Sequence, residues 1–524
     1  MSDERKIQIK KYAFLIAAAI VGFILVLICT SKYGPGVTHD SVAYIYAADS
    51  LSHGNGYEYF GYVSPFIQWP PLFPTLLAGT DLLGINAVDA SRFINALGFA
   101  AIIFLCGKWF FERLKNPLVA LLGTLAVLFA PPLLSMSINV WTETLFVLFF
   151  VAFLITFDKY IRTDRKRWLV WASVFTALAC LERYMGVTIV AIACLALLLQ
   201  KKSFKTRVIN IFTFGLISCV PTLIWVIRNY IESSTLVGVR PPALVTLAHN
   251  IKLTAKTLAS WVLPYNNLGD VLPSAGQKLV LVLSILTVVA IAVLIVVAVC
   301  FVFKKNGRDG LIKSTINKRT ILVLTGFIII YTIYMIISAT KVAFDPIGDR
   351  YMIPVYIPLI LLAILLIDNA TSIFKSIGTR KLIPAAMVLL TAVWLLYPAL
   401  RTAEVVKMTT EYGTGGYAST EWKNNNLIKY LRGLAPDGAV FTNDAAAVNT
   451  AGGIDAKYTP RKNGPEIYGV EKFKKLVESS KTSYLVWFST VENDSIYGPE
   501  DIGKLYKVEK ITSMEEGSVY KITK

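Results

Sequence analysis

Residues 12–30 read YAFLIAAAIVGFILVLICT, an unbroken apolar stretch that follows the basic residues Lys6, Lys10 and Lys11. A helix of about 20 apolar residues crosses the hydrocarbon core of a bilayer, so this stretch is long enough to span it. It is too long for the apolar part of a secretory signal, and no convincing small-residue cleavage site follows it. We therefore predict a retained first membrane helix.

The composition of the whole chain agrees with a membrane location. Of the 524 residues, 55% are hydrophobic and 16% are charged, whereas about a quarter of the residues in a soluble domain are charged. The net charge of +18 comes from short basic clusters between apolar runs. Such clusters orient membrane proteins, so we expect contact with membrane lipids and no nucleic-acid partner. The six cysteines lie in or beside apolar runs without CxxC or metal-type spacing, and they indicate no disulfide framework.

Ten further apolar runs are of spanning length or slightly shorter, which gives about eleven predicted membrane helices. The least certain assignment is the division between 168–182 and 185–200. If these runs formed one helix, every later segment, including the C-terminal domain, would lie on the opposite side of the membrane. The ten runs are 91–110, 117–135, 141–158, 168–182, 185–200, 208–228, 278–303, 320–340, 351–368 and 382–399.

The basic residues predict the orientation. If the N-terminus is cytoplasmic, the inner segments carry 25 Lys and Arg in 65 residues, whereas the longer outer loops carry only ten. Cytoplasmic loops are enriched in Lys and Arg, so we expect an inner N-terminus and an outer C-terminus, in the cell membrane of a bacterium or archaeon. The inner segments are 1–11, 108–116, 159–167, 201–207, 304–319 and 369–381.

The chain divides near residue 400. Residues 1–400 form the predicted membrane module, with long outer loops at 31–90 and 229–277 that we expect to contain short helices. One of these is expected to begin at Trp69-Pro70-Pro71, because proline suits the first turn of a helix.

After Leu400 the apolar runs shrink to strand length, and we predict a soluble extracytoplasmic α/β domain over 401–524. The fold class is therefore mainly α, a polytopic helical bundle with a C-terminal α/β domain. The expected elements are helices at 419–433 and 470–480, strands at 438–443 and 483–489, and alternating segments near 505–512 and 517–523.

Polar residues gather at helix ends, all on the predicted outer side. Such residues can build a site facing a shared cavity of the bundle. They are Asp40, Glu143, the run Glu182-Arg183-Tyr184, the pair Arg228-Asn229, and the run Asp349-Arg350-Tyr351.

Each position also has an ordinary explanation. Glu143 follows Thr142 and would favour a helix N-terminus, and Arg183 and Arg350 would serve as interfacial anchors. Asp40 would be a solvated loop acid. We expect His39 and His53 to be polar loop residues, so that no metal is bound.

The set suits transfer of a sugar from a lipid phosphate to a hydroxyl. The leaving phosphate is a weak base and needs no proton donor, so one carboxylate suffices as general base on the acceptor. Arginine binds phosphate oxygens through two donors at once and stays ionised near a membrane. The same residues would also suit a carrier of an anionic lipid.

Five motifs, in this order, resemble the GT-C superfamily of integral membrane glycosyltransferases, especially the branch with protein O-mannosyltransferases and aminoarabinose lipid A transferases. The order, the spacing and the shared side give the resemblance its weight. The motifs are Asp40-Ser-Val-Ala-Tyr44 with Gly54-Asn-Gly56-Tyr57, Trp69-Pro70-Pro71-Leu72-Phe73-Pro74 with Ser91-Arg92-Phe93-Ile94-Asn95, Thr142-Glu143, Trp225-Val-Ile-Arg228-Asn229-Tyr230, and Arg350-Tyr351-Met-Ile-Pro354.

The resemblance implies Asp40 as catalytic base and Glu143 in the donor or acceptor pocket, with Arg228 and Arg350 holding the carrier phosphate. Arg183 and Tyr351 are the further candidate substrate contacts. Two positions depart from the family pattern. Many relatives have an Asp-Glu pair where this chain has Asp40-Ser41, and some have lysine where it has Trp69.

The resemblance further implies an inverting transfer that needs no metal or cofactor. The donor would be a polyprenyl-phosphate sugar and the acceptor an extracytoplasmic glycan, lipid or protein. Two other classes stay open at this point: a flippase or exporter of a lipid-linked intermediate, and a membrane-anchored scaffold that binds envelope polymers.

Overall fold

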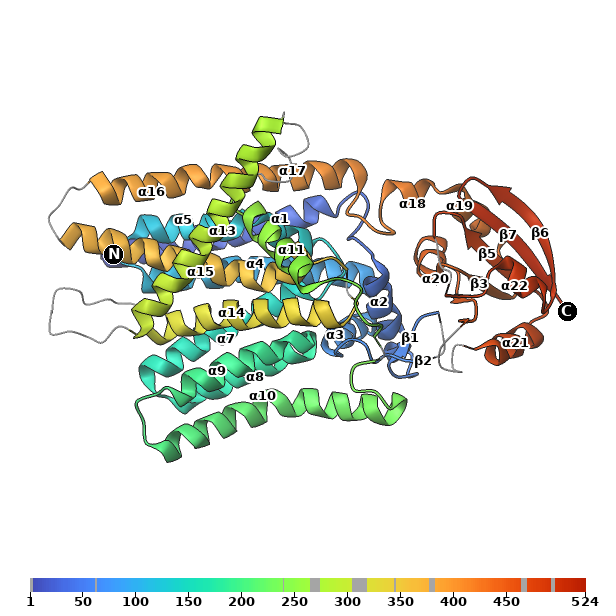
Figure 1. Cartoon of the computed structure of the whole chain (residues 1–524), viewed down its shortest axis with the longest axis horizontal. Helices are drawn as coiled ribbons and strands as arrows, with labels where there is room; N and C mark the ends of the chain where they lie inside the picture. Colours follow the sequence, from blue (N-terminus) through green and yellow to red (C-terminus); the bar gives the residue numbers. More distant parts are fainter. Residues whose placement is uncertain are drawn as a thin grey trace.

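The computed structural model describes residues 3–61, 64–238, 240–263, 274–303, 318–343, 345–376, 382–462, 469–491 and 495–524. It contains a bundle of long helices with a small mixed sheet at one end (Figure 1). The N-terminus lies at the other end of the bundle (Figure 1). Parts of several predicted segments lie outside the described residues, namely the outer loops 31–90 and 229–277, the inner segments 1–11, 304–319 and 369–381, and the C-terminal domain.

The apolar runs are helical throughout the described residues. Within the part of the chain that the structure describes, eight helices are long and apolar enough to cross a membrane, and a bent pair makes a ninth span if counted as one. The chain is therefore an integral membrane protein, and the count of eleven stays a prediction. The helices are α1 (Asp3–Cys29), α4 (Ala87–Arg113), α5 (Pro117–Leu128), α6 (Pro131–Ser137), α7 (Glu143–Thr163), α8 (Lys166–Glu182), α9 (Val187–Leu198), α10 (Phe204–Ser233), α13 (Ser274–Phe303), α14 (Lys318–Lys341), α15 (Asp349–Ser376), α16 (Leu382–Trp394) and α17 (Leu396–Tyr412).

Three predicted spans are shorter or more broken than a single straight helix. The run 117–135 is divided into α5 and α6, which meet at 43°, because the adjacent prolines Pro131 and Pro132 lack the amide hydrogens that would continue α5. Helices α8 and α9 have 17 and 12 residues, about 25 and 18 Å at 1.5 Å per residue. Both fall short of the roughly 30 Å hydrocarbon core.

A buried carboxylate ties three helices together at the end of the bundle that carries the N-terminus. Asp158 on α7 is 2% exposed and accepts from Arg113 at 2.6 Å and from Arg162 at 3.1 Å. The Thr320 hydroxyl of α14 donates to Asp158 Oδ1 at 2.7 Å. Two guanidiniums and a hydroxyl therefore satisfy one buried charge.

We expect Asp158→Asn to destabilise the protein by about 1–3 kcal/mol, the usual worth of hydrogen bonds to charged groups. Asparagine keeps the size of the side chain but leaves both arginines without a counter-charge. The thermal unfolding midpoint of the purified protein in detergent measures the effect. Asp164→Asn is the matched control, because Asp164 is 63% exposed and its ion pair with Lys202 contributes little. Equal midpoints for the two variants would contradict the structural role of Asp158.

The predicted outer loops contain short helices at the end of the bundle nearest the sheet (Figure 1). Residues 31–90 form α2 (His39–Ser52), β1 (Glu58–Tyr59), β2 (Ser64–Pro65) and α3 (Leu72–Asp81). Helix α3 begins directly after Pro71, as its prolines predicted. In the second loop, α11 covers Leu247–Ser260. The inner faces of α2 and α3 share a buried cluster that includes Tyr44, Phe66 and Phe73.

The C-terminal region has the predicted order of helices and strands. Its sheet has the order β4-β3-β5-β7-β6, with β4, β3 and β5 parallel and β7 and β6 antiparallel to their neighbours. One buried cluster lies on each face. The elements are α18 (Thr420–Asn424), α19 (Asn426–Leu434), β3 (Ala439–Thr442), α20 (Ala445–Ala447), a π-helical turn (Val448–Gly452), β4 (Ala456–Tyr458), α21 (Val470–Ser479), β5 (Ser483–Phe488), α22 (Pro499–Gly503), β6 (Lys507–Met514) and β7 (Gly517–Thr523).

Candidate active site

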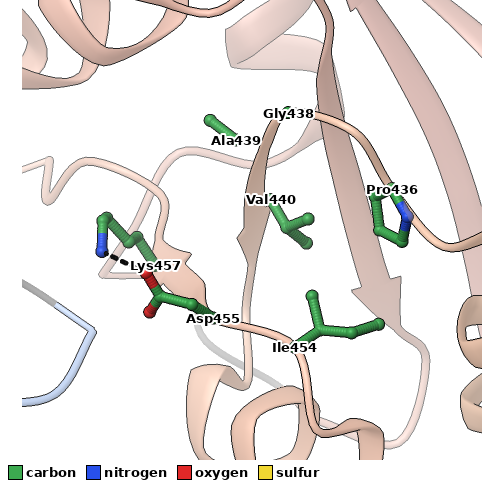
Figure 2. Close-up of a pocket in the computed structure, with 7 residues that line it drawn as sticks. All are labelled: Pro436, Gly438, Ala439, Val440, Ile454, Asp455 and Lys457. Atoms are coloured by element: carbon green, nitrogen blue, oxygen red, sulfur yellow. Dashed lines mark hydrogen bonds and ion pairs between the residues drawn. The ribbon is translucent and has the colours of Figure 1, made fainter.

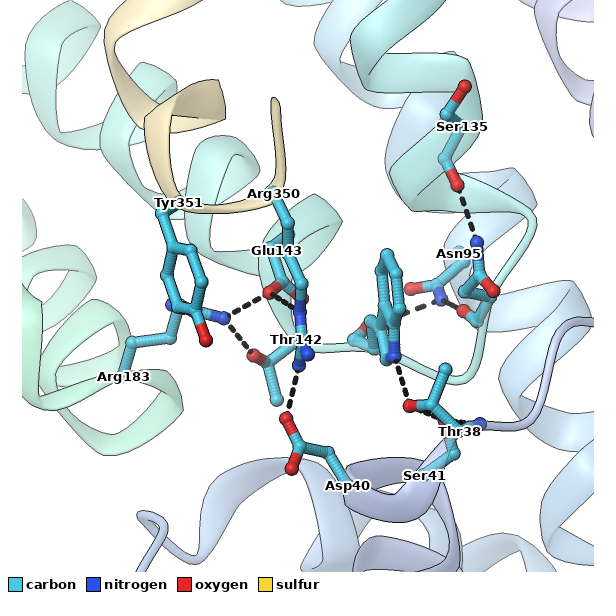
Figure 3. Close-up of polar contacts among 12 residues, drawn as sticks. Thr38, Asp40, Ser41, Asn95, Ser135, Thr142, Glu143, Arg183, Arg350 and Tyr351 are labelled. Atoms are coloured by element: carbon cyan, nitrogen blue, oxygen red, sulfur yellow. Dashed lines mark hydrogen bonds and ion pairs between the residues drawn. The ribbon is translucent and has the colours of Figure 1, made fainter. Parts of the chain in front are cut away.

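Arg350, from the last part of the membrane module's sequence, joins two carboxylates from the first half of that module. Its Nη2 donates to Asp40 Oδ2 at 2.5 Å, and its Nε donates to Glu143 Oε1 at 2.9 Å (Figure 3). The Arg350 side chain is 16% exposed, Asp40 25% and Glu143 0%. The planar guanidinium fork is what allows one cation to hold two acids in fixed positions.

A second arginine completes the network from another helix. Arg183 Nη1 donates to the same Glu143 Oε1 at 2.5 Å and to Thr142 Oγ1 at 3.0 Å (Figure 3). Glu143 is thus held by two cations rather than used as a helix cap. The structure brings Asp40, Glu143, Arg183 and Arg350 together, and their roles in function stay predictions.

Helix ends place these side chains. Asp40 lies in the first turn of α2 and Glu143 is the first residue of α7, while Arg350 lies in the first turn of α15. Arg183 directly follows the last residue of α8. Carboxylates at helix N-termini are favoured by the helix dipole. The four positions therefore lie at one end of the bundle, next to α2 and α3 and away from Asp158.

Trp141 is a member of the site that sequence reasoning did not single out. Its ring lies against the Arg350 guanidinium, 4.2 Å from the centroid, and its Nε1 donates to Thr38 Oγ1 at 2.9 Å. Cation–π contact with this partly buried ring restricts the rotamers of the arginine. The signal was present in the run Asn139-Val-Trp-Thr-Glu143, where an aromatic residue sits two positions before the acid.

Glu182 also lies at this site, and its environment was not predicted. It is 1% exposed, and neither carboxylate oxygen has a hydrogen-bond partner among the described residues. Glu143 Oε2 and Arg183 Nε are likewise buried without partners there. Buried polar atoms are normally satisfied, so these four atoms mark unused hydrogen-bonding capacity beside the ion pairs. The site contains three carboxylates and two guanidiniums.

Arg228 is not part of the ion-pair network. Its Nη1 donates to Phe66 O at 2.9 Å, and its guanidinium lies 4.9 Å from the Trp225 ring centroid. Arg240 reaches the same segment and donates to Gln68 O at 2.8 Å. Both arginines thus donate to backbone carbonyl oxygens of the segment beside β2. Sequence reasoning missed Arg240.

Tyr184 connects the two groups of arginines. Its hydroxyl accepts from Trp225 Nε1 at 3.1 Å and from Asn229 Nδ2 at 3.2 Å. Tyr184 directly follows Arg183, and Asn229 directly follows Arg228.

Tyr351 lies next to Arg350, and its carbonyl oxygen accepts from the Tyr331 hydroxyl at 2.9 Å.

The two departures from the family pattern have structural uses. Ser41 Oγ accepts from Thr38 N at 3.0 Å, which caps α2 just before Asp40. Trp69 stacks on Tyr59 and Phe66, with centroids 5.9 and 5.6 Å away. Neither position adds a charge to the site.

One group of side chains has the composition of a metal site. Asp49, His53 and Asp81 bring ligand-type atoms within 4.8 Å of one another. They lie at the C-terminal ends of α2 and α3, whereas Asp40 lies at the opposite end of α2. The side chains of Asp49 and His53 are 66% and 65% exposed. The group is therefore separate from the ion-pair network.

A pocket of about 360 Å³ lies in the C-terminal region, at the N-terminal ends of β3 and β4 (Figure 2). Its charged lining residues are Asp455 and Lys457, which pair with each other at 3.2 Å. It contains no residue of the ion-pair network. We therefore place the candidate active site at the network. The lining residues are Pro436, Gly438, Ala439, Val440, Ile454, Asp455 and Lys457.

Part of the chain matches a known protein family. Residues 68–225 match the family model described as dolichyl-phosphate-mannose-protein mannosyltransferase. This match includes Glu143 and Arg183 and ends at Trp225. No curated protein sequence matches the chain significantly.

Solved structures share the fold over almost the whole chain. ArnT from Cupriavidus metallidurans bound to undecaprenyl phosphate is similar with a TM-score of 0.62 at 10% identity, covering 97% of both chains. The archaeal oligosaccharyltransferase AglB from Archaeoglobus fulgidus, in complex with an inhibitory peptide and a dolichol-phosphate, has a TM-score of 0.54 at 13% identity. That match covers 93% of this chain and 70% of AglB. The chain therefore has the GT-C fold that its five motifs predicted.

Proposed function

We propose that this protein is an inverting glycosyltransferase that takes sugar from a polyprenyl-phosphate carrier and transfers it to an extracytoplasmic acceptor, with Asp40 as general base. The observation that carries the proposal is Arg350, which holds the Asp40 and Glu143 carboxylates at helix ends on one side of a GT-C bundle. The undecaprenyl phosphate bound by the similar ArnT supports the donor class.

In the proposed reaction, Asp40 removes the proton of an acceptor hydroxyl as its oxygen attacks the anomeric carbon of the sugar. The new carbon–oxygen bond forms on the face opposite the bond to the carrier phosphate, which breaks. The phosphate leaves with the electron pair and needs no proton. Asp40 suits the role because Arg350 holds Oδ2, while Oδ1 accepts no hydrogen bond from the described residues.

Two sets of arginines would have different roles, one in positioning the carboxylates and one in binding the carrier phosphate. Arg183 and Arg350 are paired with carboxylates, so their main effect is to hold Asp40 and Glu143 in place. The second set is Arg228, which donates to carbonyl oxygens beside β2 and to which we assign the phosphate oxygens of the carrier. Glu182 and the open oxygen of Glu143 would accept hydrogen bonds from hydroxyls of bound sugar.

The proposed function is tested by detecting the two products of the reaction, the free carrier phosphate and the glycosylated acceptor. Purified wild-type protein in detergent, supplied with a panel of undecaprenyl-phosphate-linked sugars and a membrane extract as acceptor source, should release free undecaprenyl phosphate and label an acceptor. Thin-layer chromatography and mass spectrometry follow both products. Movement of intact donor across reconstituted vesicles, without release of carrier phosphate, would instead identify a flippase.

The proposed orientation gives a separate prediction. Because the basic loops predict a cytoplasmic N-terminus, a reporter fused after Tyr412, where α17 ends, should be extracytoplasmic. A reporter fused near Lys166, at the start of α8, should be cytoplasmic. Paired phosphatase and fluorescent-protein fusions measure both. A cytoplasmic signal after Tyr412 would mean that the odd helix count is wrong.

A further inference from the structure

The two residues before Thr38 lie between two other parts of the chain. Gly36 pairs in parallel with Asn139, and Val37 pairs in parallel with Gly416. Gly36 N donates to Ile138 O and Val140 N donates to Gly36 O, both at 2.9 Å, and Tyr417 N donates to Val37 O at 2.7 Å. Three segments far apart in sequence therefore form a short strand-like ladder.

Two segments of this ladder lead into the candidate site, and the third leads to the C-terminal sheet. The central segment continues through Thr38 into Asp40 at the start of α2. The segment at 138–140 continues into Glu143 at the start of α7. The third, residues 413–417, connects α17 to the C-terminal sheet. The ladder thus holds Gly36 and Val37, which lead into α2, between the segment that leads into α7 and the chain that leads to the sheet.

Gly416 makes a contact that no other residue type permits. Its φ is +56°, and a Cβ there would lie 2.1 Å from Val37 O. Real Cβ atoms do not approach so closely, so any side chain at 416 must push Val37 away. Because Val37 lies three residues before Asp40, this displacement acts directly on the start of α2.

Tyr417 links the ladder to the C-terminal sheet through a hydrogen bond. Its hydroxyl donates to Asp444 Oδ1 at 3.0 Å, and Asp444 Oδ1 also accepts from Ala447 N at 3.0 Å. Asp444 follows β3 at the carboxyl end of the parallel strands and is 8% exposed. Burial raises the pKa of the Asp444 carboxyl. On the other side of the ladder, Thr414 Oγ1 donates to Gly34 O at 2.8 Å.

We propose that Gly416 and Tyr417 are positioning residues, and that segment 413–417 holds Asp40 at the distance from Glu143 and Arg350 that catalysis requires. The C-terminal region is then part of the catalytic apparatus through this segment, without touching the reacting atoms. The inference rests on the proposed function, since it assigns a purpose to the position of Asp40.

The test compares Gly416→Ala with Gly453→Ala in the full-length protein. Both glycines have positive φ, +56° and +68°, but a Cβ at Gly453 meets nothing within 4 Å. Backbone strain is thus matched, and only the collision with Val37 differs. Hydrogen exchange of peptides covering 36–46 and 413–419 reports the ladder. Sugar-transfer turnover and undecaprenyl phosphate binding report the site.

In Gly416→Ala we expect exchange at the Tyr417 amide about fivefold faster than in wild type, as expected for the loss of one hydrogen bond. Turnover should fall about tenfold while carrier binding stays within about twofold, because misplaced catalytic groups affect the reaction more than binding. Gly453→Ala should match wild type in both measurements. Tyr417→Phe, which keeps the ring and removes the bond to Asp444, should lower turnover in the same direction.

Unchanged exchange in Gly416→Ala would overturn the ladder, and faster exchange with unchanged turnover would overturn its role in positioning Asp40. Equal losses of turnover in Gly416→Ala and Gly453→Ala would also overturn it, because strain alone would then explain both. If wild-type protein transfers no sugar, the proposed function fails, and the positioning role fails with it. The exchange comparison would still decide separately whether the ladder exists.

Discussion

Replacing Asp40 with asparagine is expected to lower the rate of sugar transfer by about a hundred- to ten-thousandfold, the usual contribution of a general base. The amide has the size of the carboxylate, and its oxygen can still accept from Arg350, so packing around α2 should survive. It cannot accept the proton of the acceptor hydroxyl. Donor binding should therefore change little while turnover almost disappears, the pattern of a lost transition-state interaction.

Asp49→Asn is the matched control for this experiment. Asp49 lies on the same helix, its side chain is 66% exposed, and it belongs to the separate group near His53. Turnover of this variant should equal that of wild type. If Asp40→Asn transferred sugar at the wild-type rate, Asp40 would be only a structural partner of Arg350, and a flippase would explain the structure better.

Arg350→Lys is expected to lower turnover by about a hundredfold. One ammonium cannot donate to Asp40 and Glu143 in the geometry of the guanidinium fork, and it loses the flat contact with Trp141. A charge-assisted hydrogen bond is worth about 1.5–3 kcal/mol, or roughly ten- to a hundredfold, before the stacking is counted. The rate of transfer by purified protein, with protein folding checked by size-exclusion chromatography, measures the effect.

Two further variants separate this role from a phosphate contact. Arg401→Lys repeats the substitution in the partly exposed i,i+3 pair with Glu404 and should leave turnover unchanged. Arg228→Ala should weaken undecaprenyl phosphate binding, whereas Arg350→Lys should mainly reduce turnover. Wild-type turnover in Arg350→Lys would mean that the fork of Arg350 is not needed to position Asp40 and Glu143.

The helices and the C-terminal elements were predictable because their signals are local. The apolar runs that predicted membrane helices are helical in the structure, and the strand-length runs at 438–443 and 483–489 are β3 and β5. Strand β4 was missed, since it has three residues and carries no apolar run. The helix predicted at 419–433 is divided at Asn425, whose side chain caps the second helix, α19.

The sequence predicted that Asp40, Glu143, Arg183 and Arg350 lie on one side of the bundle, but not that they contact one another. Hydropathy and charge place residues at helix ends, but they do not specify which ends meet. The contact between Arg350 and Asp40 spans 310 residues and depends on how α15 packs against α7 and α6. Arg228 had the same sequence signal as Arg350, yet it lies outside the ion-pair network.

The ladder at Gly36, Val37 and Gly416 had no signal in the sequence. Its hydrogen bonds use backbone atoms, and the segments that it joins are short and irregular. Glycine-rich composition at 413–416 suggests an ordinary linker. Only the positive φ of Gly416 and the absence of space for a Cβ show that the segment makes a specific contact.

Comparative mass spectrometry of envelope glycolipids, glycans and glycoproteins tests the central claim most directly. Three strains are compared: one with the wild-type protein, one without it, and one that produces Asp40→Asn at the wild-type level. We expect one or more acceptors to lose a single sugar in the strain without the protein and equally in the Asp40→Asn strain. Identical glycosylation in all three strains, or full glycosylation with Asp40→Asn, would contradict the assignment of a glycosyltransferase with Asp40 as its base.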